Sequence, residues 1–205
     1  NLVMGVLTTL RPWKVLNQVG FLITLGIAGG YVLLHANDTQ QDQIALLVVL
    51  HSLLFIWLAF RFSQLLRKQD LHGFSLQPSL DLGLLFGAPL LAYACLYLIY
   101  FEQTMMQAGL SAGYAVLYAV LYVLAKQQQQ IGWIKQSYLA LSLIFAAFIP
   151  AIILPAEWGV MGWAILGIAM LVIALKRESE IGRYIAMALL AIAGGVAAYY
   201  FVELS

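Results

Sequence analysis

Seven long apolar stretches constrain the fold of this chain more than any other feature of its sequence. They run from about residues 15 to 35, 44 to 62, 82 to 101, 108 to 126, 137 to 154, 159 to 176 and 184 to 202. An apolar stretch of about 18 residues or more is a candidate transmembrane segment, because lipid cannot satisfy open backbone groups and a helix satisfies them internally. The sequence therefore predicts an all-α, polytopic transmembrane helical bundle with about seven spans.

The composition excludes two classes of protein. The chain is 63% hydrophobic and 9% charged, with a mean hydropathy of +0.92, whereas a soluble domain is about half apolar and a quarter charged. The formal net charge is only +1, and a nucleic-acid-binding domain needs a basic patch to displace counterions from phosphates. We therefore expect the lipid bilayer as a partner and no nucleic acid.

The first ten residues are apolar but too short to span a bilayer, which takes about 20 residues. We expect them to be the tail of a truncated helix, so that residues 1–205 form a single transmembrane helical module of a longer chain. The remaining spans of that chain, or other membrane subunits, would then be its protein partners.

Charge predicts the orientation of the spans. All ten lysines and arginines fall before the first span or after the second, fourth and sixth. The loops after the first, third and fifth spans carry only Asp38, Asp42, Glu102 and Glu157. Because cations are retained on the cytoplasmic side, we expect the first full span to start in the cytoplasm and the C-terminus to lie outside.

The polar segments at the ends of the spans have an interfacial character. In LRPWKVLNQVGF, at residues 10–21, Pro12 ends one helix and Trp13 lies beside two cations, as expected at headgroup depth. Trp158 and Trp163 are expected in the aromatic belt of the opposite face. The loop from Ser63 to Leu80 carries leucines among charges and predicts either a short interfacial helix or a solvated loop.

Three segments resemble a known family. They are RPWKVLNQVGF at 11–21, DLGLLFGAPLLAYA at 81–94 and SYLALSLIFAAFIPAIILPAEWGVMGWAILGIAM at 137–170. They are similar to a family of large bacterial predicted membrane proteins, domain-of-unknown-function family 2339. The chain departs from the expected pattern at Leu166, where an acidic residue is expected. The resemblance implies a multi-pass protein of the bacterial inner (cytoplasmic) membrane, with more than seven spans and no assigned activity, and it supplies no catalytic residues.

The sequence contains no recognisable catalytic or metal-binding constellation. It has no HExxH, no phosphate-binding GxxxxGK[ST] and no His/Cys cluster at ligand spacing. We therefore assign no catalytic, cofactor-binding or metal-ligating residue and expect no cofactor. If the protein is an enzyme, its catalytic set lies outside this segment.

His51 is the one histidine expected near the middle of a span. Its neighbours at helical spacing, among them Leu47 and Phe55, are apolar, so we expect its hydrogen-bond partner to come from another helix. Three roles remain open: a structural interhelical bond, a ligand contact and a proton relay.

Tyrosines form the second feature of the predicted interior. Tyr93, Tyr97 and Tyr100 share one helical face, and Tyr114, Tyr118 and Tyr122 share another. We predict an intramembrane polar cluster of His51, Tyr93, Tyr97 and Tyr118, which serves either as a packing seam or as a groove for an amphipathic ligand.

Prolines and small residues lie inside several of the predicted spans. Pro89 and Pro150 fall inside spans and are expected to kink them. Four pairs of small residues have the four-residue spacing that permits close helix approach or a dimer face: Gly26 and Gly30, Gly109 and Gly113, Ala191 and Gly195, Gly194 and Ala198.

The sequence favours an integral inner-membrane protein with a non-catalytic structural or assembly role in the bacterial envelope. The alternative is a transporter or channel segment for an amphipathic or lipid-linked substrate. A solvent-filled cavity lined by His51, Tyr93 and Tyr118 would favour the alternative, and a dry interior would favour the structural role.

Overall fold

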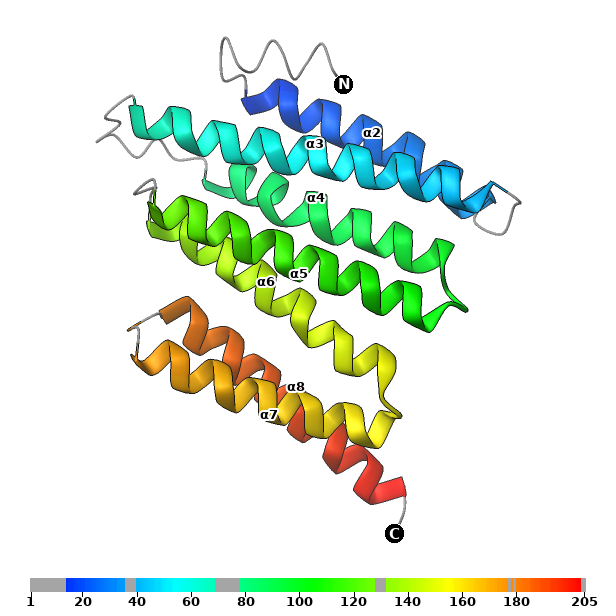
Figure 1. The fold of residues 1–205 in the computed structure, drawn as a ribbon, viewed down its shortest axis with the longest axis vertical. Coiled ribbons are helices and arrows are strands. Elements are labelled where there is room, and N and C mark those ends of the chain that lie inside the picture. The colour runs from blue at the N-terminus through cyan, green and yellow to red at the C-terminus, as the bar shows by residue number, and fades with distance from the viewer. Residues whose placement is uncertain are drawn as a thin grey trace. The chain divides into compact units, whose positions relative to one another are not determined.

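The computed structural model describes residues 14–35, 40–68, 78–127, 132–176, 178 and 180–203, and the described part of the chain contains helices and no strands. The helices are α2 (Lys14–His35), α3 (Gln41–Lys68), α4 (Pro78–Ile99), α5 (Thr104–Gln127), α6 (Gly132–Ile153), α7 (Ala156–Lys176) and α8 (Glu180–Glu203) (Figure 1). Each predicted span coincides with one of these helices. The all-α prediction is confirmed.

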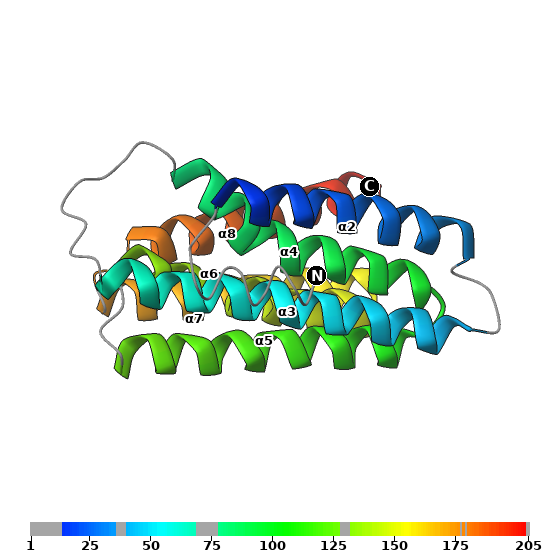
Figure 2. The same ribbon diagram turned by 90° about the horizontal axis from the view of Figure 1, so that it is seen from above.

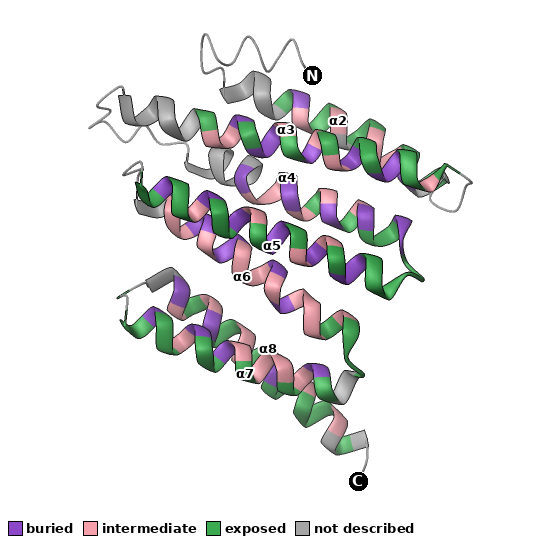
Figure 3. Ribbon diagram, in the orientation of Figure 1, coloured by how far each residue is buried: buried purple, intermediate pink, exposed green. Residues whose placement is uncertain are grey.

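Five of the described helices contain segments long and apolar enough to cross a membrane: Gln41–Arg61, Thr104–Gln127, Ile134–Ile153, Trp158–Lys176 and Gly182–Tyr200. Within their described parts, α2 and α4 carry shorter apolar segments, Val19–Val32 and Leu85–Ile99. The chain is therefore a multi-pass membrane protein. Apolar side chains on the outer faces fit this setting, since Leu34 is 79% exposed and Val116 63% exposed (Figure 3).

The helices form two compact units, which we describe separately. Unit 1 contains α2, α3 and α4, and unit 2 contains α5 to α8 (Figure 2). That residues 1–205 act as a single module stays a prediction.

In unit 1, α4 packs against both α3 and α2, while α2 and α3 contact each other less. Phe55, Leu58 and Ala88 form a buried cluster, and Phe21 of α2 packs against it. The rings of Phe21 and Phe55 meet edge to face, with centroids 5.2 Å apart. Phe21 also lies near α4, where a Cβ built on Gly87 would be 3.6 Å from its ring, an ordinary contact distance.

In unit 2, α5 packs on α6 and α7 packs on α8, and α6 also contacts both α7 and α8. The buried face of α5 repeats at three- and four-residue intervals, as one side of a helix must. It consists of Gln107, Ala108, Ser111, Tyr114, Ala115, Tyr118, Leu121 and Ala125.

The structure corrects the expected loop between the second and third spans. Helix α3 continues to Lys68, so residues 63–68 extend a spanning helix and do not form a separate interfacial one. A helix is not required to end at the membrane surface, since its backbone hydrogen bonds continue equally well in water. Residues 69–77 lie outside the described residues, as do residues 1–10 and Trp13.

Candidate functional site

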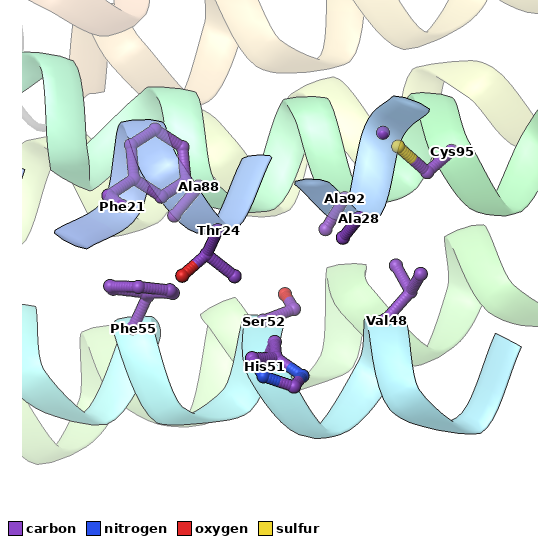
Figure 4. Close-up of a pocket in the computed structure, with 11 residues that line it drawn as sticks. Phe21, Thr24, Ala28, Val48, His51, Ser52, Phe55, Ala88, Ala92 and Cys95 are labelled. Carbon is purple, nitrogen blue, oxygen red and sulfur yellow. The ribbon is translucent and has the colours of Figure 1, made fainter. Parts of the chain in front are cut away.

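Unit 1 contains a small hollow where its three helices meet. The hollow has a volume of about 40 Å³, which is room for about one water molecule at the density of the liquid. Its polar lining comes from Thr24, His51, Ser52 and Cys95, and the rest is small or apolar. Figure 4 shows Thr24 on α2 and Ser52 on α3 facing the same space, with Cys95 at one end.

A larger groove adjoins the hollow between α2 and α3, with a volume of about 630 Å³. Thr24, Ala28, Val48 and His51 line both spaces. Ala28 is the smallest side chain that α2 contributes to the groove lining. Gly26, Gly29 and Gly30 do not line the groove, and a Cβ built on any of them would meet no atom within 4 Å.

One ring nitrogen of His51 has its hydrogen-bond partner on the same helix. Its Nδ1 lies 2.8 Å from the backbone carbonyl oxygen of Leu47, one turn earlier, so Nδ1 carries the proton and donates it. The expectation that the partner must come from another helix is wrong. The neighbouring side chains of His51 are apolar, but a side chain on a helix can also bond to the backbone carbonyl four residues before it.

Thr24 behaves in the same way. Its hydroxyl donates to the carbonyl of Gly20 over 2.7 Å. Two of the four polar side chains in the hollow therefore direct a hydrogen bond into their own backbone. This lowers the polarity that they present to the space between the helices.

Tyr93 and Tyr97 do not line the hollow or the groove. Tyr93 is buried, whereas Tyr97 is 38% exposed and meets the Phe101 ring edge to face. One turn further on, the Tyr100 hydroxyl donates to Oδ1 of Asp42 over 2.9 Å, which joins the end of α4 to the first turn of α3. Sequence reasoning placed Tyr100 on the tyrosine face but did not pair it with Asp42.

Tyr118 belongs to the aromatic core of unit 2. Its ring lies parallel to that of Phe145, with centroids 6.0 Å apart, and 6.1 Å from the ring of Tyr138. Tyr114 stacks on the same phenylalanine at 4.9 Å. The tyrosine face of α5 thus packs on α6. Because His51 and Tyr118 lie in different units, the four-residue cluster stays a prediction.

The contact between α5 and α6 carries two hydroxyl bonds, one buried and one partly buried. Ser111 of α5 donates to the carbonyl of Phe145 over 2.7 Å, and Ser142 of α6 donates to the carbonyl of Ala115 over 2.9 Å. Neither serine was singled out from the sequence. The available signal was helical spacing, since Ser111 lies three residues before Tyr114 and Ser142 lies four residues after Tyr138.

Both candidate kink prolines lie inside helices, Pro89 in α4 and Pro150 in α6. In the turn before Pro150, the carbonyl of Ala147 accepts a bond from the indole Nε1 of Trp163 over 2.7 Å. A side chain from a neighbouring helix here supports the backbone near an intramembrane proline. Trp163 is therefore bonded into the helix packing, and its place in an aromatic belt stays a prediction. Trp158 is 59% exposed.

Close helix approach occurs at other glycines than those we selected. A Cβ on Gly162 would lie 2.8 Å from Cβ of Pro150, and one on Gly167 would lie 2.8 Å from Cγ of Leu190. Within their own units, Gly30, Gly109 and Gly194 have nothing within 4 Å of such a Cβ. Residue spacing alone does not say which face of a helix meets its neighbour.

Among the described residues, no three His, Cys, Asp or Glu side chains come together in a group that could hold a metal ion.

Comparison with known proteins identifies one family. The model of a family described as "Predicted membrane protein (DUF2339)" matches residues 1–204. No curated protein and no solved structure matches the chain.

Proposed function

The chain belongs to the DUF2339 family of predicted membrane proteins, and from that premise we propose that it is a non-catalytic structural or assembly component of the bacterial inner membrane. One observation carries the proposal. The hydrogen bonds of the intramembrane polar side chains described above end on backbone carbonyls, at Gly20, Leu47, Ala115, Phe145 and Ala147.

The bonds of Ser111, Ser142 and Trp163 join two helices, those of Thr24 and His51 stay within one helix, and both kinds leave little chemistry for a substrate. A carbonyl in a helix is fixed, so a serine or tryptophan that donates to it is fixed as well. Side chains that relay protons or ions are instead ionisable groups facing a water-filled path. The cations and carboxylates of this chain fall at the ends of its spans, as Asp42, Arg61 and Lys176 illustrate.

The orientation belongs to the same proposal. Because cations are retained on the cytoplasmic side, the lysines and arginines beside the spans support a start of α2 and an α5–α6 connection in the cytoplasm, with the C-terminus outside. Further spans or other membrane subunits would pack against the exposed apolar faces that lipid does not cover.

A flux measurement tests the structural role against a proton relay through His51. The purified full-length protein is reconstituted into vesicles that contain a pH-sensitive dye, beside vesicles with no protein. We expect the same proton leak from both preparations. A leak that depends on the protein and disappears in His51→Leu would overturn the structural role and support a relay through the hollow.

A further inference from the structure

We infer that the groove between α2 and α3 binds one acyl chain of a membrane lipid, from the leaflet on the side of the α2–α3 connection. The lining of the groove runs from Ile23 to Leu34 on α2 and from Ile44 to His51 on α3. This inference uses only the membrane setting of the chain. It holds whether the protein is structural or moves a substrate.

The dimensions of the groove fit a single chain. Its volume of about 630 Å³ lies within the range of about 300–1,000 Å³ found for small-molecule sites. On α2 the lining runs from Leu34 to Ile23, which is about 16 Å at 1.5 Å per residue. One leaflet contributes about half of the roughly 30 Å hydrocarbon thickness, so an acyl chain of ordinary length reaches from one end of the groove to the other.

The chemistry of the lining also selects a hydrocarbon. No charged side chain lines the groove, and eight of its residues are aliphatic. At the deep end, Thr24 and His51 direct hydrogen bonds to Gly20 and Leu47 of their own helices. At the other end, Leu34 is the last residue but one of α2, so the groove ends where a lipid headgroup begins. Tyr31 is a polar-tipped aromatic near that end, as is common close to headgroups.

The packing of unit 1 explains why the groove stays open between its own helices. Helices α2 and α3 both pack chiefly on α4, and the side chains that α2 presents between Thr24 and Tyr31 on this face include the small Ala28. An acyl chain would supply the van der Waals contacts that side chains do not make there. Such contacts, rather than escape from water, drive packing inside a bilayer.

Photo-crosslinking tests the inference on the full-length protein in vesicles of phosphatidylethanolamine and phosphatidylglycerol. The probe is a phosphatidylethanolamine with a diazirine at the end of one acyl chain, and labelled residues are identified by mass spectrometry. We expect labelling at Val48, which is 7% exposed, to exceed labelling at Leu50, which is 52% exposed, by at least about threefold. Leu50 is an exposed residue of α3 that lines neither space.

Two variants of α2 make the result specific. Ala28→Leu fills the groove and should return labelling at Val48 to the level at Leu50. Gly26→Leu enlarges an exposed position of the same helix that lines neither space, and should leave the pattern unchanged. If Ala28→Leu fails to give the helical content of the parent protein, Ala28→Val serves in its place.

Three outcomes would overturn the inference. Equal labelling at Val48 and Leu50 means ordinary boundary lipid with no preferred chain. Labelling at Leu50 but none at Ile27 or Val48 means that another protein segment covers the groove. Preferred labelling of Val48 that persists in the filled variant means that the chain binds elsewhere.

Discussion

Ser111 of α5 and Ser142 of α6 form reciprocal hydrogen bonds, each from its hydroxyl to the backbone of the other's helix. Each donates to a backbone carbonyl of the opposite helix, at Phe145 over 2.7 Å and at Ala115 over 2.9 Å. The two bonds fix how far α5 is shifted along α6. They lie beside the stacked rings of Tyr114, Tyr118 and Phe145. They are the clearest case in this chain of polar groups that serve packing.

The first prediction concerns these serines. Ser111→Ala and Ser142→Ala should each lower the free energy of unfolding in detergent by only about 0.6 kcal/mol, because interhelical hydrogen bonds in membranes average that value. Val116→Ala, on the exposed face of α5, is the control and should change stability less than either serine variant. A loss above about 2 kcal/mol from one serine would contradict a purely packing role.

The second prediction concerns the approach of α7 to Pro150. Gly162→Ala would place a Cβ 2.8 Å from Cβ of Pro150, and the rigid proline ring cannot move aside, so we expect destabilisation of about 1–3 kcal/mol. At Gly159 the nearest atom would be at 3.6 Å, an ordinary contact distance. Gly159→Ala should therefore be tolerated. The measurement is the melting temperature of both variants in the same detergent. Equal melting temperatures would show that α6 and α7 can move apart to accommodate the Cβ without a loss of stability.

The third prediction concerns the pH dependence of Tyr100, which follows the last residue of α4. Burial, together with its hydrogen bond to Asp42 and the charge of that residue, raises the pKa of Tyr100 from 10 to about 12. The folded state thus favours the neutral hydroxyl. Its stabilising contribution is complete below pH 10 and is lost as the pH rises through about 12.

Tyrosinate absorbance measures this titration directly, as the difference between the parent protein and Tyr100→Phe. Asp42→Asn should bring the Tyr100 pKa back toward 10, because it removes the charge that opposes ionisation. Titration of Tyr100 at its ordinary pKa in the parent protein would mean that the bond to Asp42 does not form in the membrane.

The fourth prediction concerns topology. In a Cys95→Ser background, single cysteines at Asp38 and Gln128 should react with an impermeant thiol reagent from opposite sides of the membrane, with Gln128 on the cytoplasmic side. The reason is the retention of cations near the α5–α6 connection. Reaction of both positions from one side would require a different number of crossings between them.

Some features of the structure followed from sequence patterns alone. Apolar length placed every span on one helix, because a bilayer leaves the backbone no alternative to internal hydrogen bonds. Helical spacing also identified the face that carries Tyr114 and Tyr118, and both residues are buried. These inferences needed only local periodicity and the solvent.

Other features depended on the tertiary structure. The partners of His51, Ser142 and Trp163 are backbone carbonyls, and every residue has a carbonyl, so no residue type marks the acceptor. The glycines at the closest contacts were likewise indistinguishable from exposed ones by spacing. The groove beside Ala28 could be found only from the packing of the three helices of unit 1. An empty space is defined by what the surrounding side chains leave unfilled, and no single stretch of sequence encodes the positions of those side chains.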